Sequence, residues 1–156
     1  MKQSGLVTLL TDFGVSDPYA AVMKGVILSA SRTARVVDIT HGVPPQDVVT
    51  GSVFLGAAAP YFPPGCVHLV VVDPGVGGPR RAVAVQTERN WYVAPDNGVL
   101  TQILADEAVT ACVDITGFAP NGAVRSATFH GRDIFAPVCG LLASGVPLAD
   151  LGPPAR

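Results

Sequence analysis

Acidic and imidazole side chains follow three apolar segments of this sequence. Asp12 comes directly after the apolar residues 6–10, residues 38–41 close a second apolar segment, and Asp73 follows the largely apolar run 67–72. Carboxylates accept hydrogen bonds and imidazoles transfer protons near neutral pH, so these groups could bind a polar ligand or perform acid–base chemistry. Because ligands bind at the carboxyl ends of strands in open α/β sheets, the three placements favour a shared site. An aspartate that caps a turn accounts for any single placement equally well.

The three histidines lie in different settings. His68 lies within an apolar segment and is expected to be structural, whereas His41 and His130 lie in polar loops, where structural and functional roles are equally supported. Together with Asp12 and Asp73, the two loop histidines have the composition of a metal site. No pair among them has the spacing of a zinc motif such as HExxH, so no metal is expected.

The loop at 73–80 is rich in glycine, which raises the question of phosphate binding. A P-loop would need a terminal Gly-Lys-Ser/Thr, and this sequence is missing from the loop. A dinucleotide fingerprint starting at Gly75 would need glycine at position 80, where Arg80 stands, and Pro79 has no backbone donor. The glycines are therefore expected to let the backbone approach a bulky ligand closely.

Segments of strand length alternate with segments of helix length along the chain. Asp17 and Pro18 are typical of the start of a helix that ends near residue 31, and Asp47 can cap a second helix that runs toward residue 61. Strands are predicted at 6–10, 36–39, 67–72, 82–87, 91–94 and 111–115, and further helices at 98–105 and 134–143. This alternation predicts an α/β fold of three layers, in which helices cover both faces of a mostly parallel sheet.

Composition limits the class of protein. The chain has 156 residues, the size of one domain, of which 49% are hydrophobic and 14% are charged. Because soluble domains carry about 25% charged residues, an extensive subunit or domain interface is expected. The formal net charge of −2 offers no attraction for nucleic acid, so no nucleic-acid partner is expected.

The cysteines and the N-terminal segment indicate the compartment. Cys66, Cys112 and Cys139 are odd in number and have no CxxC spacing, which argues against a disulfide framework and a cysteine zinc site. The apolar run 6–10 is too short for the core of a signal peptide or for a membrane span. A cytoplasmic protein that does not bind a membrane is therefore expected.

Five longer sequences occur together in this chain and span nearly all of it. They are TDFG at 11–14, DITHGVPPQDV at 38–48, VVDPGVGGPRR at 71–81, APDNGVLT at 94–101 and TFHGRDIFAP at 128–137. In this order they resemble the S-adenosyl-L-methionine hydroxide adenosyltransferase family, relatives of the fluorinase and chlorinase enzymes. The resemblance implies hydrolytic cleavage of S-adenosyl-L-methionine by water or hydroxide at the ribose 5′ carbon, giving adenosine and L-methionine. It implies no cofactor, because S-adenosyl-L-methionine is the substrate.

The resemblance also assigns catalytic roles. The family's water-activating trio falls on Asp73, Arg80 and His130, whereas the halogenating relatives replace the aspartate and histidine positions with tyrosines. A histidine can accept the proton that water loses as it attacks, so His130 is the expected base. Asp73 is expected to orient the imidazole or the water, and Arg80 to stabilise hydroxide character.

Substrate-binding roles follow in the same way. Asp12 matches the family carboxylate that accepts hydrogen bonds from both ribose hydroxyls, and Thr128 and Phe129 match residues that flank the ribose and the sulfur. Asn97 is a weaker substrate-binding candidate, because ordinary turn chemistry explains it equally well. Gln46 stands where the fluorinase has an aromatic residue that lines the ribose pocket.

Family members continue into a second, mostly β domain that contacts adenine and the methionine end of the substrate, and they assemble as trimers. The resemblance therefore implies that residues 1–156 are the N-terminal α/β domain of a homotrimer, with the C-terminal β domain absent from this chain. The chain could be a truncated gene, a fragment or a divided protein whose second domain acts in trans. Two alternatives stay open. The chain could be a truncated, non-catalytic remnant that trimerises or binds a ligand, or it could be a halide-using relative similar to the chlorinase and fluorinase.

Overall fold

Six strands form one sheet in the computed structural model, which describes residues 2–120 and 126–155. The strands are β1 (Leu6–Thr11), β2 (Arg35–Thr40), β3 (Val67–Val71), β4 (Ala82–Thr87), β5 (Trp91–Pro95) and β6 (Val109–Asp114). Their order across the sheet is β2-β1-β3-β5-β4-β6. β1, β2, β3 and β5 pair in parallel, whereas β4 is antiparallel to both of its neighbours, β5 and β6. The prediction of a mostly parallel sheet is confirmed.

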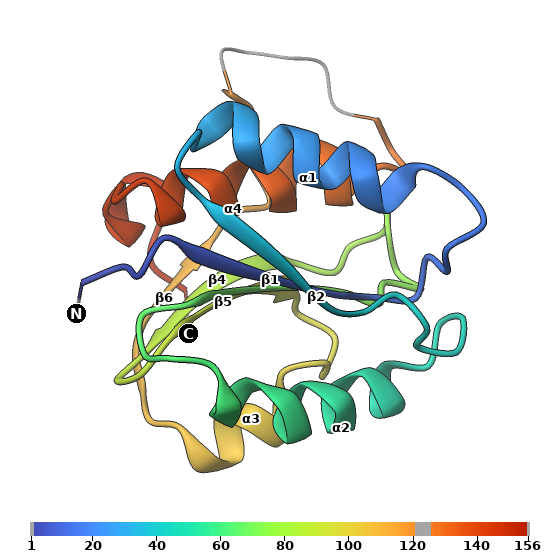
Figure 1. The fold of residues 1–156 in the computed structure, drawn as a ribbon, viewed down its shortest axis with the longest axis horizontal. Helices are drawn as coiled ribbons and strands as arrows, with labels where there is room; N and C mark the ends of the chain where they lie inside the picture. The colour runs from blue at the N-terminus through green and yellow to red at the C-terminus, as the bar shows by residue number, and fades with distance from the viewer. Residues whose placement is uncertain (1, 121–125, 156) are drawn as a thin grey trace.

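Helices cover both faces of this sheet (Figure 1). α1 (Tyr19–Ala30) and α4 (Ala136–Ala143) lie side by side on one face, and α2 (Val48–Ala58) and α3 (Thr101–Asp106) lie on the other. Shorter helical turns occur at Ala59–Tyr61, Gly131–Phe135 and Leu148–Asp150. The predicted α/β fold of three layers is therefore confirmed. None of the helices in the described ranges is long and apolar enough to cross a lipid bilayer.

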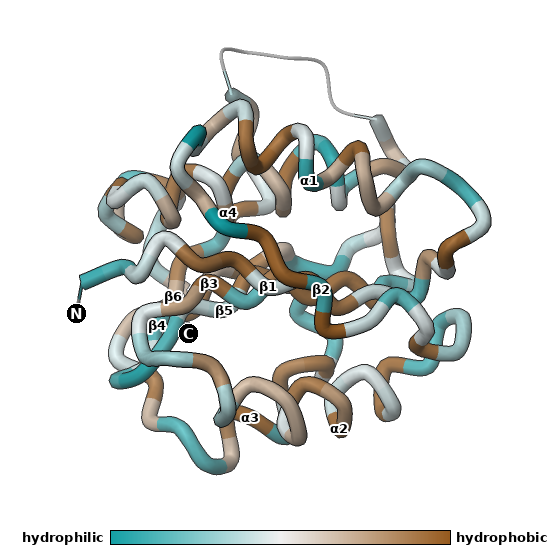
Figure 2. Tube along the Cα trace, in the orientation of Figure 1, coloured by the Kyte–Doolittle hydropathy of each residue, from teal (hydrophilic) through white to brown (hydrophobic). Residues whose placement is uncertain are grey.

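The strands divide their apolar side chains between two cores. Val7 and Leu9 of β1 belong to the core beneath α1 and α4, whereas Leu10 packs with Leu55 of α2 in the core on the opposite face. Every residue of β3 is buried, as expected of a central strand covered on both sides. The brown, hydrophobic stretches of the sheet in Figure 2 lie between the two helical layers. Each large apolar side chain contributes about 1.5–3 kcal/mol by burial, so the sheet is a firm frame for its loops.

Local chemistry decides where the helices begin. Asp47 caps α2 as predicted, since its Oδ1 accepts a backbone N–H of the first turn at 2.9 Å. α3 begins at Thr101 instead of residue 98 because Gly98 has a φ of 97° and belongs to the preceding turn. The last helix begins at Ala136 instead of residue 134 because residues 131–135 form a wider π-helical turn, a feature that is frequent near functional sites.

His68 is buried in β3, consistent with the structural role predicted for it. Its Nδ1 lies 2.7 Å from Thr8 Oγ1, and its ring stacks on that of Tyr92 with 5.0 Å between centroids. Burial, together with the nearby charge of Arg89, lowers the pKa of His68 to about 4. The imidazole is therefore neutral in the folded protein at neutral pH, and it is a part of the sheet core.

We predict that acid weakens the fold through His68. Its pKa is about 4 in the folded protein and about 6.5 in the unfolded chain, so the unfolded chain binds the extra proton between these values. Stability should fall as the pH drops through this range, by about 3 kcal/mol in all. The variant His68→Gln does not titrate there and should show a flatter profile. Urea denaturation of both proteins measures the difference, and parallel profiles would contradict the prediction.

Candidate active site

A cavity of about 470 Å³ opens at the carboxyl ends of β1 and β3, a volume suited to a small ligand. The chain leaves β1 to form β2 on one side and later forms β3 on the other. Such a topological switch point leaves a crevice between two loops, the usual ligand site of open α/β sheets. The cavity is lined by Asp12, Phe13, Asp17, Pro18, Tyr19, Val22, Val71, Asp73, Val76, Thr128, Phe129 and Gly131. Four of the predicted site residues are among them: Asp12, Asp73, Thr128 and Phe129.

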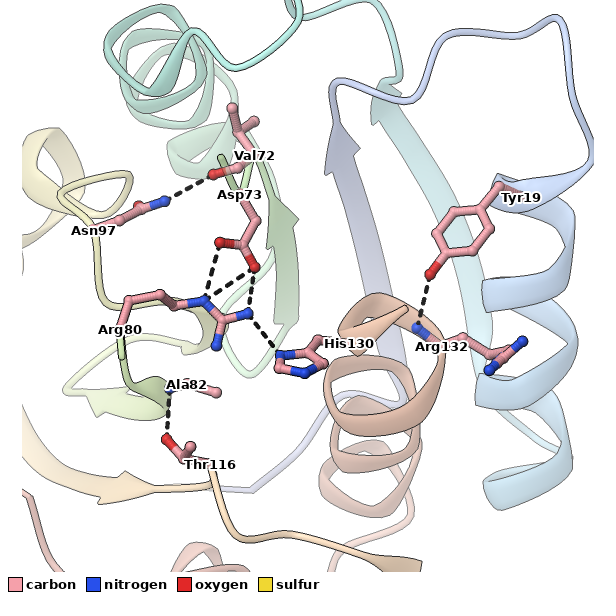
Figure 3. Close-up of polar contacts among 9 residues, drawn as sticks. All are labelled: Tyr19, Val72, Asp73, Arg80, Ala82, Asn97, Thr116, His130 and Arg132. Atoms are coloured by element: carbon pink, nitrogen blue, oxygen red, sulfur yellow. Dashed lines mark hydrogen bonds and ion pairs between the residues drawn. The ribbon is translucent and has the colours of Figure 1, made fainter. Parts of the chain in front are cut away.

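A buried ion pair joins the two ends of the loop that follows β3. Arg80 Nε donates to the carboxylate oxygens of Asp73 at 3.0 and 3.1 Å, and Arg80 Nη2 donates to Oδ2 at 2.5 Å (Figure 3). Only 9% of the Arg80 side chain and 5% of the Asp73 side chain are exposed. At this burial either charge would be strongly destabilising without the other, so the two-pronged pair holds the loop in one closed form.

Glycine lets this loop close on the protein itself. Gly77 has a φ of 77°, and a Cβ there would lie 2.5 Å from the carbonyl oxygen of Ala127. A Cβ on Gly75 would lie 3.2 Å from Arg80 Cγ. The close approach that was predicted for a ligand is made at these two positions by the protein's own chain. The contact at Ala127 sets the loop against the segment that carries Thr128.

His130 continues the series that begins at Asp73. Arg80 Nη2 lies 2.9 Å from His130 Nδ1, so the guanidinium stands between the carboxylate and the imidazole (Figure 3). A guanidinium has donors and no acceptor, so Nδ1 accepts this bond and a neutral His130 carries its proton on Nε2. Asp73 was expected to orient the imidazole or the water. The orienting contact seen here reaches the imidazole through Arg80.

Asp12 presents its carboxylate to the same cavity from the end of β1. Its Oδ2 accepts the backbone N–H of Gln46 at 2.7 Å. Gln46 belongs to the loop between β2 and α2 and has a φ of 66°. This contact was not predicted, because glycine or asparagine usually marks such a backbone conformation in a sequence.

Three aromatic rings form one wall of the cavity. The ring of Tyr19 lies 4.6 Å from that of Phe13 and 5.5 Å from that of Phe129, measured between centroids. The Arg132 guanidinium covers the Phe129 ring at 5.0 Å. The backbone N–H of Arg132 donates to the Tyr19 hydroxyl at 3.3 Å (Figure 3). Burial raises the pKa of Tyr19, so this hydroxyl is protonated at neutral pH. Tyr19 was not predicted as a site residue; its only signal was an aromatic residue directly after Pro18.

Asn97, the weaker substrate-binding candidate, holds a turn in this structure. Its Nδ2 donates to the carbonyl oxygen of Val72 at 2.9 Å, and its Oδ1 accepts the N–H of Val99 at 3.1 Å. It does not line the cavity described above. The amide nitrogen therefore ties the loop after β5 to the end of β3, and the amide oxygen closes the turn within that loop, which favours the interpretation as turn chemistry.

His41, a member of the set considered for a metal, is engaged within the protein. Its Nδ1 lies 2.8 Å from Thr11 Oγ1, and its Nε2 lies 3.2 Å from Asp38 Oδ1. Within residues 2–120 and 126–155, no three histidine, cysteine or acidic side chains are grouped as metal ligands would be. The candidate site is thus made of the cavity, Asp12, the aromatic wall and the series from Asp73 to His130.

This combination defines a class of protein. The three-layer α/β domain has a crevice at a switch point, and beside it a carboxylate–guanidinium–imidazole series whose ion pair is buried. These features are those of a small-molecule-binding domain of the enzyme type. Comparison with known families is more specific. Residues 7–152 match the SAM hydroxide adenosyltransferase N-terminal domain, so the chain belongs to the S-adenosyl-L-methionine hydroxide adenosyltransferase family.

Individual relatives agree with this assignment. The chain is 49% identical over 154 residues to an (R)-S-adenosyl-L-methionine hydrolase of Salinispora tropica, covering 98% of this chain and 59% of the relative. A fluorinase of Actinopolyspora mzabensis is 26% identical, with 94% and 57% covered. The crystal structure of an uncharacterized conserved protein from Thermotoga maritima superposes with a TM-score of 0.91 at 41% identity, covering 96% of this chain and 59% of that one. The chain therefore spans a little under three fifths of the length of these proteins.

We predict that Asp73 and Arg80 stabilise the fold only as a pair. Asp73→Asn leaves the guanidinium buried beside a neutral group, and Arg80→Met leaves the carboxylate unpaired, so each should lower the free energy of unfolding by about 3 kcal/mol. The double variant Asp73→Asn/Arg80→Met should lose clearly less than the sum of the two. Urea denaturation at pH 7 measures all four proteins. Costs that add within about 0.5 kcal/mol would show that the two groups are independent.

Proposed function

We propose that this chain carries the ribose-binding and water-activating part of an S-adenosyl-L-methionine hydrolase. The reaction would cleave the substrate at the ribose 5′ carbon and give adenosine and L-methionine. One observation carries the proposal: the series Asp73–Arg80–His130, with its buried ion pair, stands next to a cavity that also presents Asp12. The 49% identity to the (R)-S-adenosyl-L-methionine hydrolase of Salinispora tropica supports it, and the fluorinase at 26% identity is more distant.

Asp12 is suited to hold the ribose. A carboxylate has two acceptor oxygens, which match the two donors of a vicinal diol. Asp12 lines the cavity at the end of β1, and the Gln46 N–H occupies part of the acceptor capacity of one oxygen. The two ribose hydroxyls are proposed to bind the remaining lone pairs, which would place the 5′ carbon on the side of the cavity that carries Asp73.

The series beside the cavity is suited to activate water. In this structure Arg80 Nη2 bonds His130 Nδ1 directly at 2.9 Å, so the imidazole would first have to exchange this bond for one from water. A water molecule taken in between the two groups in this way would accept a hydrogen bond from the guanidinium and donate one to His130 Nδ1. As its oxygen attacks the 5′ carbon, one proton passes to His130 Nδ1, and the electron pair of the carbon–sulfur bond leaves with sulfur as the methionine thioether. Arg80 stabilises the hydroxide character of the oxygen, and Asp73 keeps Arg80 in place.

The aromatic wall fits the charge change of this reaction. The sulfonium of the substrate loses its positive charge when the carbon–sulfur bond breaks. The rings of Phe13, Tyr19 and Phe129 form a wall that displaces water from the sulfonium, while ring faces can attract the cation as the substrate binds. The same wall would keep bulk water away from the 5′ carbon.

We also propose that the protein acts as a homotrimer together with a second, mostly β domain that contacts adenine and the methionine end, as the family resemblance implies. The outer side of α2 supports an interface. Val49 and Val53 are 74% and 51% exposed, Tyr61 just beyond the helix is 90% exposed, and the helix itself carries no charged residue. Exposed apolar side chains gathered on one element are typical of surfaces covered in an assembly.

The first prediction from this proposal concerns the nucleophile. In the presence of the second domain, the protein should convert S-adenosyl-L-methionine to adenosine and methionine in equal amounts. In oxygen-18 water the label should enter the 5′ oxygen of adenosine, because the new bond is made by solvent oxygen. Mass spectrometry of the products measures this. A dominant 5′-chloro product in high chloride would instead identify a halide as the nucleophile.

The second prediction separates chemistry from binding. His130→Ala should lower turnover by about 10²–10⁴-fold and leave the affinity for adenosine nearly unchanged, because the base acts on water. Asp12→Ala should first weaken adenosine binding through loss of the diol contact. Asp96→Ala is the matched control, since it removes an exposed ion pair with Arg81 and Asp96 does not line the cavity. Steady-state kinetics and calorimetry measure the two effects, and full turnover by His130→Ala would remove this base from the mechanism.

A further inference from the structure

Gln46 adopts a backbone conformation that few side chains tolerate. Among residues 2–120 and 126–155 it is the one non-glycine residue with a positive φ, at 66°. Residues in such sparsely populated regions persist only where their surroundings enforce the conformation, and they gather at functional sites. The contacts that hold Gln46 in this conformation therefore indicate what the conformation is for.

The conformation serves a contact with Asp12. It directs the Gln46 N–H at Asp12 Oδ2, 2.7 Å away, across a separation of 34 residues in the chain. A hydrogen bond to a carboxylate is stronger than one between neutral groups. Fixing one oxygen in this way also fixes the plane of the carboxylate, and with it the direction in which the other lone pairs face the cavity.

His41 ties together the two loops that make this contact. Its ring binds Thr11, the residue before Asp12, with 2.8 Å between Nδ1 and Oγ1. Its carbonyl oxygen accepts the N–H of Gly14 at 2.7 Å, and the N–H of Val43 reaches the Thr11 carbonyl oxygen at 3.4 Å. The loop that ends in Gln46 is thereby attached to the loop that begins with Asp12.

The donors and acceptors around Thr11 and His41 determine which of the two groups donates the proton in the hydrogen bond between them. Thr11 Oγ1 accepts the N–H of Phe13 at 3.3 Å, and its own proton can be donated to His41 Nδ1. A neutral His41 then carries its proton on Nε2, which lies 3.2 Å from Asp38 Oδ1. Asp38 in turn binds Lys24 Nζ of α1 at 2.6 Å.

We propose that His41 and the backbone amide of Gln46 are positioning groups that set the orientation of the Asp12 carboxylate. Neither touches the substrate in this proposal, and the side chain of Gln46 has no part in it. The inference rests on the proposed function, in which Asp12 binds the ribose diol. It follows that disturbing either group should reduce the preference of the protein for a nucleoside with a vicinal diol.

The chain contains a matched control for His41. His68 is also buried, and its Nδ1 also lies within hydrogen-bond distance of a β1 threonine, Thr8, at 2.7 Å. His68 lies within β3 and does not line the cavity. His41→Leu and His68→Leu therefore remove the same kind of contact from the same strand, near the site in one case and away from it in the other.

The test compares adenosine with 2′,3′-dideoxyadenosine, which lacks the diol, by calorimetry in the same preparation as the labelling assay. The wild-type protein should prefer adenosine, and His41→Leu should reduce this preference about tenfold, the loss of about one hydrogen bond. His68→Leu should lower the melting temperature and leave the preference unchanged. Gln46→Val disfavours a positive φ and should also reduce the preference, whereas Gln46→Gly keeps both the N–H and the conformation and should retain more of it.

The outcomes distinguish the two proposals. A wild-type protein that binds both nucleosides equally would refute the diol role of Asp12, and the positioning role with it. A wild-type preference that survives in both His41→Leu and Gln46→Val would refute the positioning role alone. Equal loss of affinity for both nucleosides in His41→Leu would show that this histidine is merely structural. If His41→Leu fails to fold, the comparison of Gln46→Val with Gln46→Gly still decides the test.

Discussion

The ion pair between Asp73 and Arg80 is the interaction on which the rest of the site depends. Two opposite charges with almost no exposure are stable only in contact, because each alone would lose its hydration without compensation. That requirement closes the loop after β3 and leaves one edge of the guanidinium to His130. The glycines follow from it, since a side chain at Gly77 would collide with Ala127 in the closed loop. A large share of the site is thus the consequence of burying one pair of charges.

The fold could be predicted from the sequence because its causes are local and repeated. Apolar runs of strand length, interrupted by aspartates and glycines, specify central strands with loops at their carboxyl ends, and the bounds of β4 agree with the prediction at 82–87. The errors lie at the ends of elements: β6 runs over Val109–Asp114 instead of 111–115, and α3 and α4 begin later than predicted. A φ of 97° at Gly98 and the wider turn at 131–135 depend on how the chain is already packed, and residue preferences alone do not reveal them.

The site was predictable only to the level of side-chain identity. Asp12, Asp73, Thr128 and Phe129 do meet at one cavity, as strand ends and family resemblance indicated. The hydrogen bonds between the site side chains could not be predicted from the sequence. The guanidinium of Arg80 stands between the carboxylate and the imidazole, which fixes the tautomer of a neutral His130. The backbone N–H of Gln46 that binds the Asp12 carboxylate could not be predicted either, because every residue except proline has such a group.

The reversed direction of β4 has a consequence for which residues can share a site. β3 ends at the carboxyl edge of the sheet, and β4, being antiparallel to β5, starts at that same edge although β5 lies between them. A few residues of loop therefore suffice to bring Arg80 back to Asp73. Had β4 run parallel, the residue before it would emerge at the opposite edge, a strand length of about 16–20 Å away, and a crossover helix would separate the two charges in the chain. Because β4 is inverted, Asp73 and Arg80 are separated by only seven positions in the sequence. A single short insertion or deletion in the loop between them would therefore misalign both charges.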